Sequence, residues 1–370
     1  MSVIELEIQL LAVVVAVACA LPGVFLVLRR MALLSDAISH TVLLGIVLAF
    51  FVVGDLSSPF LILGAAAMGV VTVALVQAIE STGLVREDAA IGLVFPALFS
   101  VAVILISRYA GDVHLDTDAV LLGELALAPF RRFVVAGRDL GPKGVWVMGG
   151  ILVLNLLFLV AFYKELKLST FDPGLAAALG LSPVLLHYAY MAVVSITAVG
   201  AFDSVGSILV VAFMIAPPAA AYLLSDRLPL VLLLSAVIGA HGAVAGYWLA
   251  RWLDASIAGS MAAMVGMDFL LAFLFAPRRG LLAQARRRAR QKTEFAVSML
   301  AIHLLNHEGR PEEETECHVG HLPEHLLWSP ERVERIVRDA ESDDVLQLNA
   351  DGTLRLTEAG RARAARAMAL

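Results

Sequence analysis

The chain has few cysteines, and its first three quarters carry little charge. Only two of its 370 residues are cysteine, Cys19 and Cys317, and they lie in parts of different composition. A disulfide framework is therefore not expected. Residues 1–276 carry 12 basic and 18 acidic side chains, while 60% of the whole chain is hydrophobic. This composition indicates a domain that lies in a membrane.

Two sequence signals are also missing. No G-x-x-x-x-G-K-[ST] phosphate-binding loop occurs in the chain, so it is not expected to bind a nucleotide through such a loop. No small-residue cleavage site follows the first apolar run. Arg29 and Arg30 follow it instead, which predicts a retained helix rather than a signal peptide. The net charge is −6 over residues 1–276 and zero over residues 277–370, which argues against a general polyanion binder.

The long apolar runs predict an all-α polytopic membrane protein with about eight to nine transmembrane helices. A bilayer core takes about 20 apolar residues per helix. The candidate spans are residues 8–28, 38–54, 59–79, 89–107, 144–163, 183–201, 205–224, 229–250 and 257–276. Residues 118–133 are too short and too interrupted to span, so we expect them at an interface or in a re-entrant hairpin.

Basic residues in short loops predict the orientation of these spans, because such residues concentrate on the cytoplasmic side. If the spans alternate, one side collects Arg29, Arg30, Arg86, Lys164, Lys167, Arg227, Arg278 and Arg279. We therefore expect that side to be cytoplasmic and the N-terminus to be outside. The loop 108–143 also carries basic residues and is the exception to this pattern.

The C-terminal part has a different composition. Residues 277–370 carry 15 basic and 15 acidic side chains, which predicts a soluble cytoplasmic domain. The expected organisation is a transmembrane domain over 1–280, a basic juxtamembrane linker over 281–292 and a small domain over 293–370. The basic run in the linker favours anionic lipid headgroups by about 1 kcal/mol per residue.

The small domain is predicted to be α+β, with three helices, a hairpin and a last helix. Ser329, Pro330 and Glu331 form a strong helix start. Residues 343–356 indicate two short strands around a turn at 349–352. Residues 345–368 resemble the wing and last helix of an iron-dependent-repressor-type winged helix.

Arginines on the helix that would then read DNA are interleaved with acids, and residues 277–370 carry no net charge. DNA binding is accordingly not expected, and a regulatory or assembly role is favoured.

The sequence around which the membrane domain is organised is the polar stretch Ser35 to His40. Asp36 and His40 are spaced i, i+4, so a helix places them on one face. Oxygen and nitrogen ligands of this kind suit manganese, iron or zinc. The alternative is that Asp36 caps a helix and His40 is simply packed. Two more candidates for a metal pathway are Asp203, between two spans, and His241, which is either a ligand or a hydrogen-bond partner of a neighbouring helix.

Four stretches together resemble the permease subunit of manganese/zinc/iron ABC importers. They are residues 30–45, 86–95, 171–181 and 202–221, and the resemblance covers about residues 8–276. It implies a permease without catalytic residues or a permanent cofactor, which conducts Mn(II), Zn(II) or Fe(II) as substrate. It also implies a homodimer in the plasma membrane, a separate cytoplasmic ABC ATPase and an extracytoplasmic metal-binding protein.

The third of these stretches also predicts a short helix. Asp172 is a good N-cap, Pro173 suits the first helical position and Gly180 suits the helix end. In the resembled family this segment is the coupling helix that docks on the ATPase, which assigns that role to Phe171, Asp172, Pro173, Gly174 and Gly180. An ordinary amphipathic loop helix is the alternative.

A histidine-rich stretch in the tail is a second candidate metal site. Cys317 and His318 are followed by His321 and His325, in an acidic surrounding. Thiolate, imidazole and carboxylate are zinc ligands, so the stretch is a candidate cytoplasmic sensor. A solvated acidic loop is the alternative, because no paired C-x-x-C accompanies it.

Two other functions stay open on the residues alone. The first is a secondary, proton-coupled metal transporter that uses Asp36, Asp203 and Asp268 as a relay. The second is a membrane-anchored metal-responsive regulator whose helices serve only as an anchor.

Overall fold

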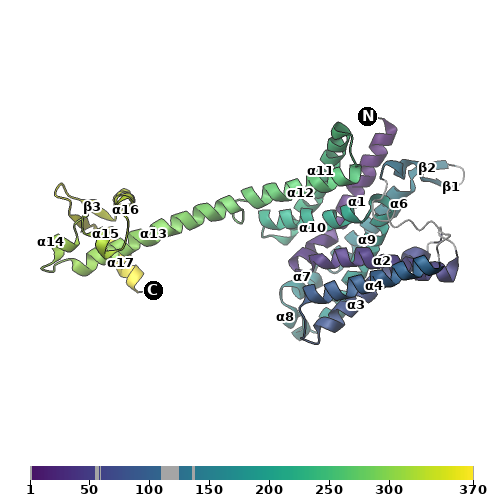
Figure 1. Ribbon diagram of the computed structural model, residues 1–370, viewed down its shortest axis with the longest axis horizontal. Helices are drawn as coiled ribbons and strands as arrows, with labels where there is room; N and C mark the ends of the chain where they lie inside the picture. The colour runs from purple at the N-terminus through teal and green to yellow at the C-terminus, as the bar shows by residue number, and fades with distance from the viewer. Residues whose placement is uncertain (1, 55–57, 59, 110–124, 136–137, 370) are drawn as a thin grey trace. The chain divides into compact units, whose positions relative to one another are not determined.

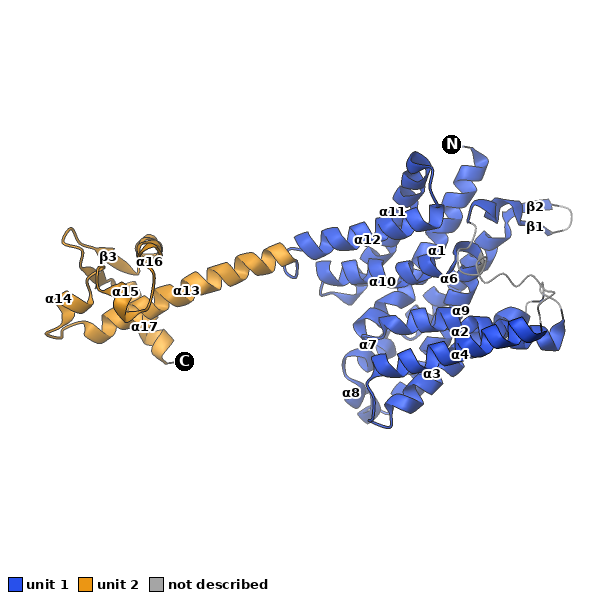
Figure 2. Cartoon of the chain, viewed as in Figure 1, with its two compact units in different colours: residues 1–280 blue, residues 281–370 orange. Residues whose placement is uncertain are grey.

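The computed structural model describes residues 2–54, 58, 60–109, 125–135 and 138–369, except the side chain of Asp203. The chain forms two compact units, residues 1–280 and 281–370 (Figure 2). Residues 118–124 of the stretch 118–133 lie outside the described residues, and the rest of that stretch forms a short 3-10 helix and the start of a strand. The first unit is helical apart from one small hairpin, and the second combines short helices with another hairpin.

The described residues contain nine helices long and apolar enough to cross a membrane, which confirms the expected number. They are α1 (Val3–Leu28), α2 (Ala32–Val53), α3 (Phe60–Glu80), α4 (Glu87–Tyr109), α6 (Lys143–Ala161), α9 (Pro183–Val205), α10 (Ser207–Leu224), α11 (Leu228–Leu253) and α12 (Ile257–Phe275) (Figure 1). The main shift from the expected spans is in α2, which begins at Ala32 rather than at residue 38.

Short elements join these helices. The 3-10 helix η1 (Leu125–Phe130) precedes a hairpin of β1 (Arg132–Val135) and β2 (Arg138–Pro142). Two short helices, α7 (Tyr163–Phe171) and α8 (Pro173–Ala178), lie between α6 and α9.

Helix α1 is the centre of the membrane unit, and 72% of its hydrophobic 18-residue segment is buried. It packs against α6, α9, α10 and α11. Polar groups at the contact of α1, α6 and α9 are paired: Asn155 of α6 donates to the carbonyl of Ala18 at 2.9 Å and to the hydroxyl of Thr197 of α9 at 3.0 Å. Since unpaired polar groups are costly in an apolar interior, these bonds determine how α6 and α9 pack against α1.

Helices α2, α3 and α4 lie side by side (Figure 1). A Cβ added to Gly45 of α2 would lie 2.4 Å from the carbonyl oxygen of Gly64 of α3. Only glycine allows this approach, which is typical of membrane helix packing. Gly242 and Gly246 make the same kind of contact within the chain, against Val265 and Met261 of α12. The G-x-x-x-G sequence therefore serves packing inside the bundle.

The junction of α9 and α10 differs from the expectation. The predicted spans 183–201 and 205–224 leave Asp203 between them, but α9 continues through this residue to Val205. The break occurs at Gly206, whose φ of 79° suits glycine. Pro217 and Pro218 do not break α10, which runs from Ser207 to Leu224.

Ion pairs connect the helix ends that share a side. Arg29, after α1, donates to Ser169 and Thr170 at the end of α7, each at 3.0 Å. At the other end of α1, Glu7 accepts from Arg132 of β1 at 2.8 Å. The hairpin that follows α4 therefore lies beside the N-terminus of α1, as alternating spans require. Arg132 is also paired with Asp139 at 2.7 Å, so acidic partners offset its charge on that side.

The second unit begins with the long helix α13 (Leu281–His307), so residues 281–292 are helical rather than a separate linker. Short helices α14 (Glu313–Glu316) and α15 (Leu322–His325) lead to α16 (Pro330–Ser342). Strands β3 (Leu346–Leu348) and β4 (Leu354–Leu356) pair antiparallel before α17 (Glu358–Met368). The hydroxyl of Thr357 accepts from the backbone of Gly360, which caps α17. These positions confirm the helix starts and the turn expected from the sequence.

The tight contact at Gly246 generates a stability prediction. A Cβ at this position would lie 2.3 Å from Cα of Met261, so Gly246→Ala forces α11 and α12 apart at a cost of about 1–3 kcal/mol. The apparent melting temperature of the detergent-solubilised protein should fall. Gly150→Ala in α6 is the matched control, because a Cβ there has no neighbour within 4 Å. Equal melting temperatures for the two variants would contradict the close approach.

Candidate functional site

Asp36 and His40 form a pair on α2. Nε2 of His40 lies 3.5 Å from Oδ1 of Asp36, and both side chains are partly exposed. Because α2 begins at Ala32 with Met31 as its N-cap, Asp36 does not cap the helix. The i, i+4 spacing thus places a carboxylate and an imidazole together on one face of a membrane helix, as expected.

Two aromatic rings of α4 hold the His40 imidazole. Its centroid lies 5.5 Å from that of Phe95 and 5.8 Å from that of Phe99. Aromatic contacts of this kind orient a ring without occupying its nitrogens. His40 is therefore packed on one side while a side-chain exposure of 27% leaves it accessible. Packing and ligand binding are compatible in this geometry.

The polar character of this region extends into α3 and α9. The hydroxyl of Thr72 donates to that of Thr41 at 2.7 Å, and Ser195 donates to the carbonyl of Ala66 at 3.0 Å. The hydroxyl of Ser39 is buried and has no hydrogen-bond partner in the described part of the chain. The buried contacts of α2 with α3 and of α3 with α9 therefore include hydrogen-bonded hydroxyls.

His241 belongs to a second pair. Its Nδ1 lies 2.9 Å from Oδ2 of Asp268, so α11 and α12 are joined by a carboxylate–imidazole contact. Asp268 thus has the partner that its place inside a span requires. The side chain of His241 is 57% exposed and that of Asp268 is 13% exposed.

The structure does not gather all the expected pathway residues into one site. Among the described side chains, no third His, Cys, Asp or Glu completes a group of three around Asp36 and His40 or around His241 and Asp268. Asp203 lies in α9, but its side chain is outside what the structure describes. One chain therefore offers two separate two-ligand groups.

The predicted short helix after Asp172 is confirmed as α8. The Asp172 carboxylate accepts from the backbone of Leu175 at 2.9 Å, Pro173 is its first residue, and Gly180 has a φ of 83°. Phe171, Leu175 and Leu179 are 62%, 47% and 66% exposed. This helix therefore presents an apolar surface outside the membrane helices, bordered by basic residues, and such a patch is typical of a protein contact.

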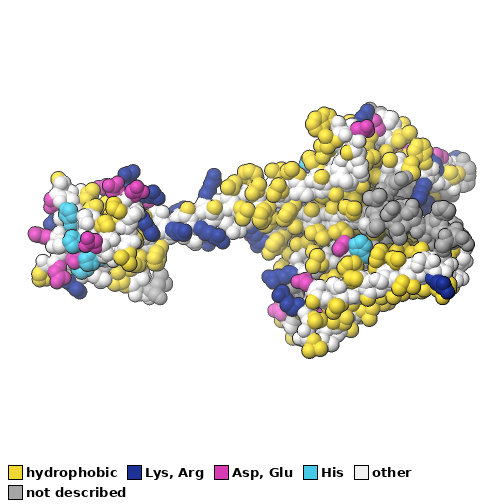
Figure 3. Space-filling model, in the orientation of Figure 1, with side chains coloured by type: hydrophobic (Ala, Val, Ile, Leu, Met, Phe, Trp, Pro, Cys, Tyr) yellow, Lys and Arg dark blue, Asp and Glu magenta, His cyan; other side chains and the backbone are white. Residues whose placement is uncertain are grey.

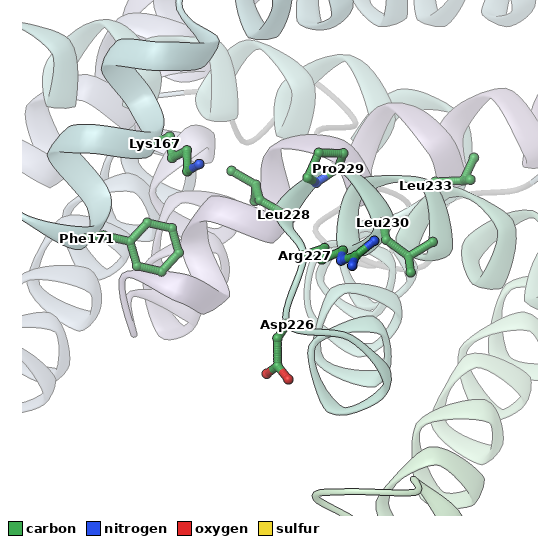
Figure 4. Close-up of a pocket in the computed structure, with 8 residues that line it drawn as sticks. All are labelled: Lys167, Phe171, Asp226, Arg227, Leu228, Pro229, Leu230 and Leu233. Carbon is green, nitrogen blue, oxygen red and sulfur yellow. The ribbon is translucent and has the colours of Figure 1, made fainter.

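An open groove of about 870 Å³ lies beside this surface (Figure 4). One wall is Lys167 and Phe171 of α7, and the other is residues 226–233 at the junction of α10 and α11. Asp226 at its edge pairs with Arg279 and, at 3.3 Å, with Arg278 at the end of α12. Arginine contacts thus anchor both walls, since Arg29 holds the end of α7.

The four tail residues expected to bind metal separate into two groups. Cys317 is 4% exposed and lies in the hydrophobic core of the second unit. Both ring nitrogens of His318 are used, one against the carbonyl of Asp351 at 3.1 Å and one by the backbone of Gly320 at 3.1 Å. His321 and His325 instead converge on Glu316.

The tail ligands predicted from the sequence omit His303 and His307 of this cluster and count Glu316 only among the surrounding acidic residues. His303, His307 and Glu316 have ligand atoms that lie within 4.8 Å of one another. The sequence did contain part of the information needed to find this cluster, because His303 and His307 are spaced i, i+4 and share one face of a helix. Nothing in the sequence indicated that Glu316 faces them rather than any of its acidic neighbours.

Comparisons with known proteins agree with this architecture. The sequence model of the ABC 3 transport family matches residues 6–276. The zinc transport system membrane protein TroD of Treponema pallidum (strain Nichols) is 51% identical over 335 residues, which cover 90% of this chain and 91% of TroD. The manganese transport system membrane protein MntD of Bacillus subtilis (strain 168) is 51% identical over 284 residues, covering 77% of this chain and 96% of MntD.

A solved structure has a similar fold. PsaBC from Streptococcus pneumoniae, in complex with Fab, superposes with a TM-score of 0.61 at 28% identity, covering 75% of this chain and 94% of the solved chain. The TroD match is longer than the membrane unit and so reaches the tail, whereas the MntD match leaves most of the tail without a counterpart.

The burial of Cys317 generates a chemical prediction. Burial, reinforced by the nearby negative charges of Glu313, Glu308 and Glu316, raises the pKa of this thiol to about 11. At pH 7 only about one thiol in 10⁴ is then the reactive thiolate. A Cys19→Ala chain, in which Cys317 is the remaining thiol, should resist maleimide labelling until denaturant is added. Rapid labelling of the folded chain would contradict the placement of Cys317 in the core.

Proposed function

Since this chain belongs to the ABC 3 transport family, we propose that it is the permease subunit of an ATP-driven importer of divalent transition-metal ions. Mn(II), Zn(II) or Fe(II) is the substrate, and a separate ATPase supplies the energy. The observation that carries the proposal is the Asp36–His40 pair on membrane helix α2. Carboxylate and imidazole are ligands that these ions accept.

Two ligands from one chain are half of a four-coordinate site. Asp36 and His40 remain partly exposed, so a second copy of the chain facing this surface would complete the set with its own pair. A homodimer of permeases is therefore part of the proposal. A weakly held, shared site suits transit, because an ion must leave it as readily as it enters.

His241 and Asp203 are proposed as further positions on the ion pathway. Asp268 orients the His241 ring through Nδ1, and Nε2 is then the nitrogen available for an ion. The support for His241 is this orientation together with the exposure of its ring. The support for Asp203 is its place near the end of a membrane helix, next to the break at Gly206.

The ATPase is proposed to dock on Phe171 to Gly180. The support is the capped helix α8, its exposed apolar side chains and the adjacent groove with Lys167 and Arg227 on its walls. Arg29 connects this surface to the turn between α1 and α2, three turns or fewer from the metal pair along the helix. A displacement of α8 would thus be passed directly to the helix that carries Asp36.

The same docking assigns the sides of the membrane. The basic ends of the helices, including Arg29 and Arg279, are proposed to be cytoplasmic, and the N-terminus and the hairpin of β1 and β2 to be outside. An extracytoplasmic metal-binding protein would deliver the ion to that outer face. Residues 281–370, which follow α12, are then cytoplasmic, and the arginines at the start of α13 suit anionic lipid headgroups.

The tail is proposed to be winged-helix-like. The support is the order of its elements, with helices α13 to α16, the hairpin of β3 and β4, and helix α17. A role in regulation or assembly fits better than DNA binding, because the tail has no net charge and Arg332 on α16 already stacks on Trp328 at 5.1 Å.

Removing a carboxylate or imidazole from the pair should stop import. We expect Asp36→Asn and His40→Ala each to lower radioactive metal uptake at least about tenfold, by analogy with the cost of disturbing a metal site. Asp254→Asn, which changes an exposed carboxylate after α11, is the matched control and should leave uptake unchanged. Wild-type uptake by both pair variants, at equal amounts in the membrane, would rule out this site.

Changing the surface of α8 should uncouple the ATPase. A Cβ at Gly174 meets only the Asp172 carboxylate, at 3.5 Å, so Gly174→Trp adds bulk outside without an internal clash. Asp172→Arg removes the cap and reverses the charge. Gly174→Trp and Asp172→Arg should each abolish ATPase pull-down and lower metal uptake. The control Leu140→Trp lies on the hairpin at the opposite side and should leave both measurements unchanged. Normal pull-down by both variants would place the docking surface elsewhere.

A further inference from the structure

Four histidines and one glutamate converge in the second unit. His303 and His307 come from α13, Glu316 from the end of α14, and His321 and His325 from the two ends of α15. The ligand atoms of His303, His307 and Glu316 lie within 4.8 Å of one another, and so do those of Glu316, His321 and His325. Glu316 is common to both groups. Figure 3 shows histidines gathered on one face of this unit beside acidic side chains.

The hydrophobic core of the second unit holds these residues in place. Each histidine pair is spaced i, i+4, so each pair shares a helix face. Leu300, Leu304 and Leu322 next to the pairs are almost completely buried in the core of the unit. The two pairs therefore face each other because α13 and α15 pack on the same core, with Glu316 between them.

Several polar atoms of the cluster are left without partners. Nδ1 of His307, Nδ1 of His321 and Oε2 of Glu316 are buried and accept or donate no hydrogen bond. Oε2 of Glu316 lies 3.1 Å from Nε2 of His325 but is not aligned for one. A buried polar atom without a partner costs about 1–3 kcal/mol. Two unpartnered imidazole nitrogens beside one carboxylate point to a cation as their partner.

The imidazoles are also close and suited to act as ligands. Ring centroids lie 4.8 Å apart for His303 and His307, 5.9 Å for His303 and His325, and 5.6 Å for His321 and His325. Burial lowers the pKa of His303, which favours the neutral form that binds metal. Its Nε2 lies 3.1 Å from the carbonyl oxygen of Glu316, a contact that fixes the ring orientation.

We propose that the tail binds one divalent transition-metal ion at this cluster, with Glu316 as the central ligand and imidazoles from both histidine pairs around it. Metal bonds of about 2.1 Å hold ligand atoms within about 4.2 Å of one another. The distances in the cluster are close to this limit, so small side-chain rotations complete the site. Imidazole and carboxylate together suit Zn(II), Fe(II) or Mn(II).

The bound ion connects α13 and α15 directly, in addition to their packing on the core and the contacts of His303 and His325 with Glu316. Since only the converged arrangement supplies all the ligands, binding stabilises it over any arrangement in which α15 leaves α13. The cluster is half-buried and therefore reachable by an ion in solution. That the ion is of the same class as the cargo, so that the tail senses imported metal, rests on the proposed function; the binding itself does not.

The test uses the full chain with Asp36→Ala, His40→Ala and His241→Ala, so that neither carboxylate–imidazole pair of the membrane unit contributes. Co²⁺ is titrated into the metal-free, detergent-solubilised protein. The expected result is visible d–d absorption that saturates at one ion per chain with a Kd of about 1 µM or tighter, and that Zn²⁺ abolishes. No thiolate-to-cobalt charge-transfer band should accompany it, because Cys317 lies outside the cluster.

Variants identify the ligands. Glu316→Gln keeps the shape of the side chain, and it and His321→Ala should each weaken Co²⁺ binding at least about tenfold. His318→Ala is the matched control, a histidine in the same segment but outside the cluster, and should bind as the parent does. Circular dichroism checks that each variant is folded, and Zn²⁺ should raise the melting temperature of the parent and of His318→Ala more than that of Glu316→Gln or His321→Ala.

Three outcomes would overturn the proposal: no cobalt spectrum, a thiolate charge-transfer band, or equal binding by folded Glu316→Gln and the parent. The result is separate from the import proposal. Metal uptake by the chain with an intact membrane pair tests import, while the spectrum is recorded on a chain that lacks that pair. Either proposal can fail without the other.

Discussion

The low polarity of the bilayer core makes every ionisable side chain within it costly, by about 2.5–3.5 kcal/mol for an aspartate. The membrane unit meets this constraint by pairing. Asp36 lies beside His40 on one helix, and Asp268 lies beside His241 across two helices. Buried amides and hydroxyls such as Asn155 and Thr197 satisfy each other. The arrangement of the helices therefore follows in large part from where polar groups find partners.

The same pairing connects the metal pair to the surface where an ATPase would act. Arg29 follows α1 and precedes α2, and its guanidinium bonds to the end of α7 beside α8. Glycines such as Gly45 and Gly64 bring helix backbones into direct contact, so a shift of one helix moves its neighbour. One arginine and closely packed helices thus connect the end of α7, beside α8, to the helix that carries Asp36.

The two units handle metal ligands differently. The membrane unit has pairs of ligands that are incomplete in one chain, which suits an ion in transit. The tail brings four imidazoles from two segments to one carboxylate, an arrangement that would suit an ion that stays. TroD of Treponema pallidum matches over a length that includes the tail, whereas MntD of Bacillus subtilis matches little beyond the membrane unit. The membrane function and the tail are therefore separable in relatives.

The amino-acid sequence by itself determined the number of membrane helices, the capped helix after Asp172 and the Asp36–His40 pair, because each depends on local spacing or on apolar length. It did not determine that α9 continues through Asp203, since the break depends on how Gly206 is placed between two packed helices. It also placed Cys317 and His318 among the tail ligands. Tertiary packing instead buried Cys317, engaged both nitrogens of His318, and brought His303 and His307 to Glu316. Which side chains meet across a core depends on contacts between distant segments, and local sequence does not encode them.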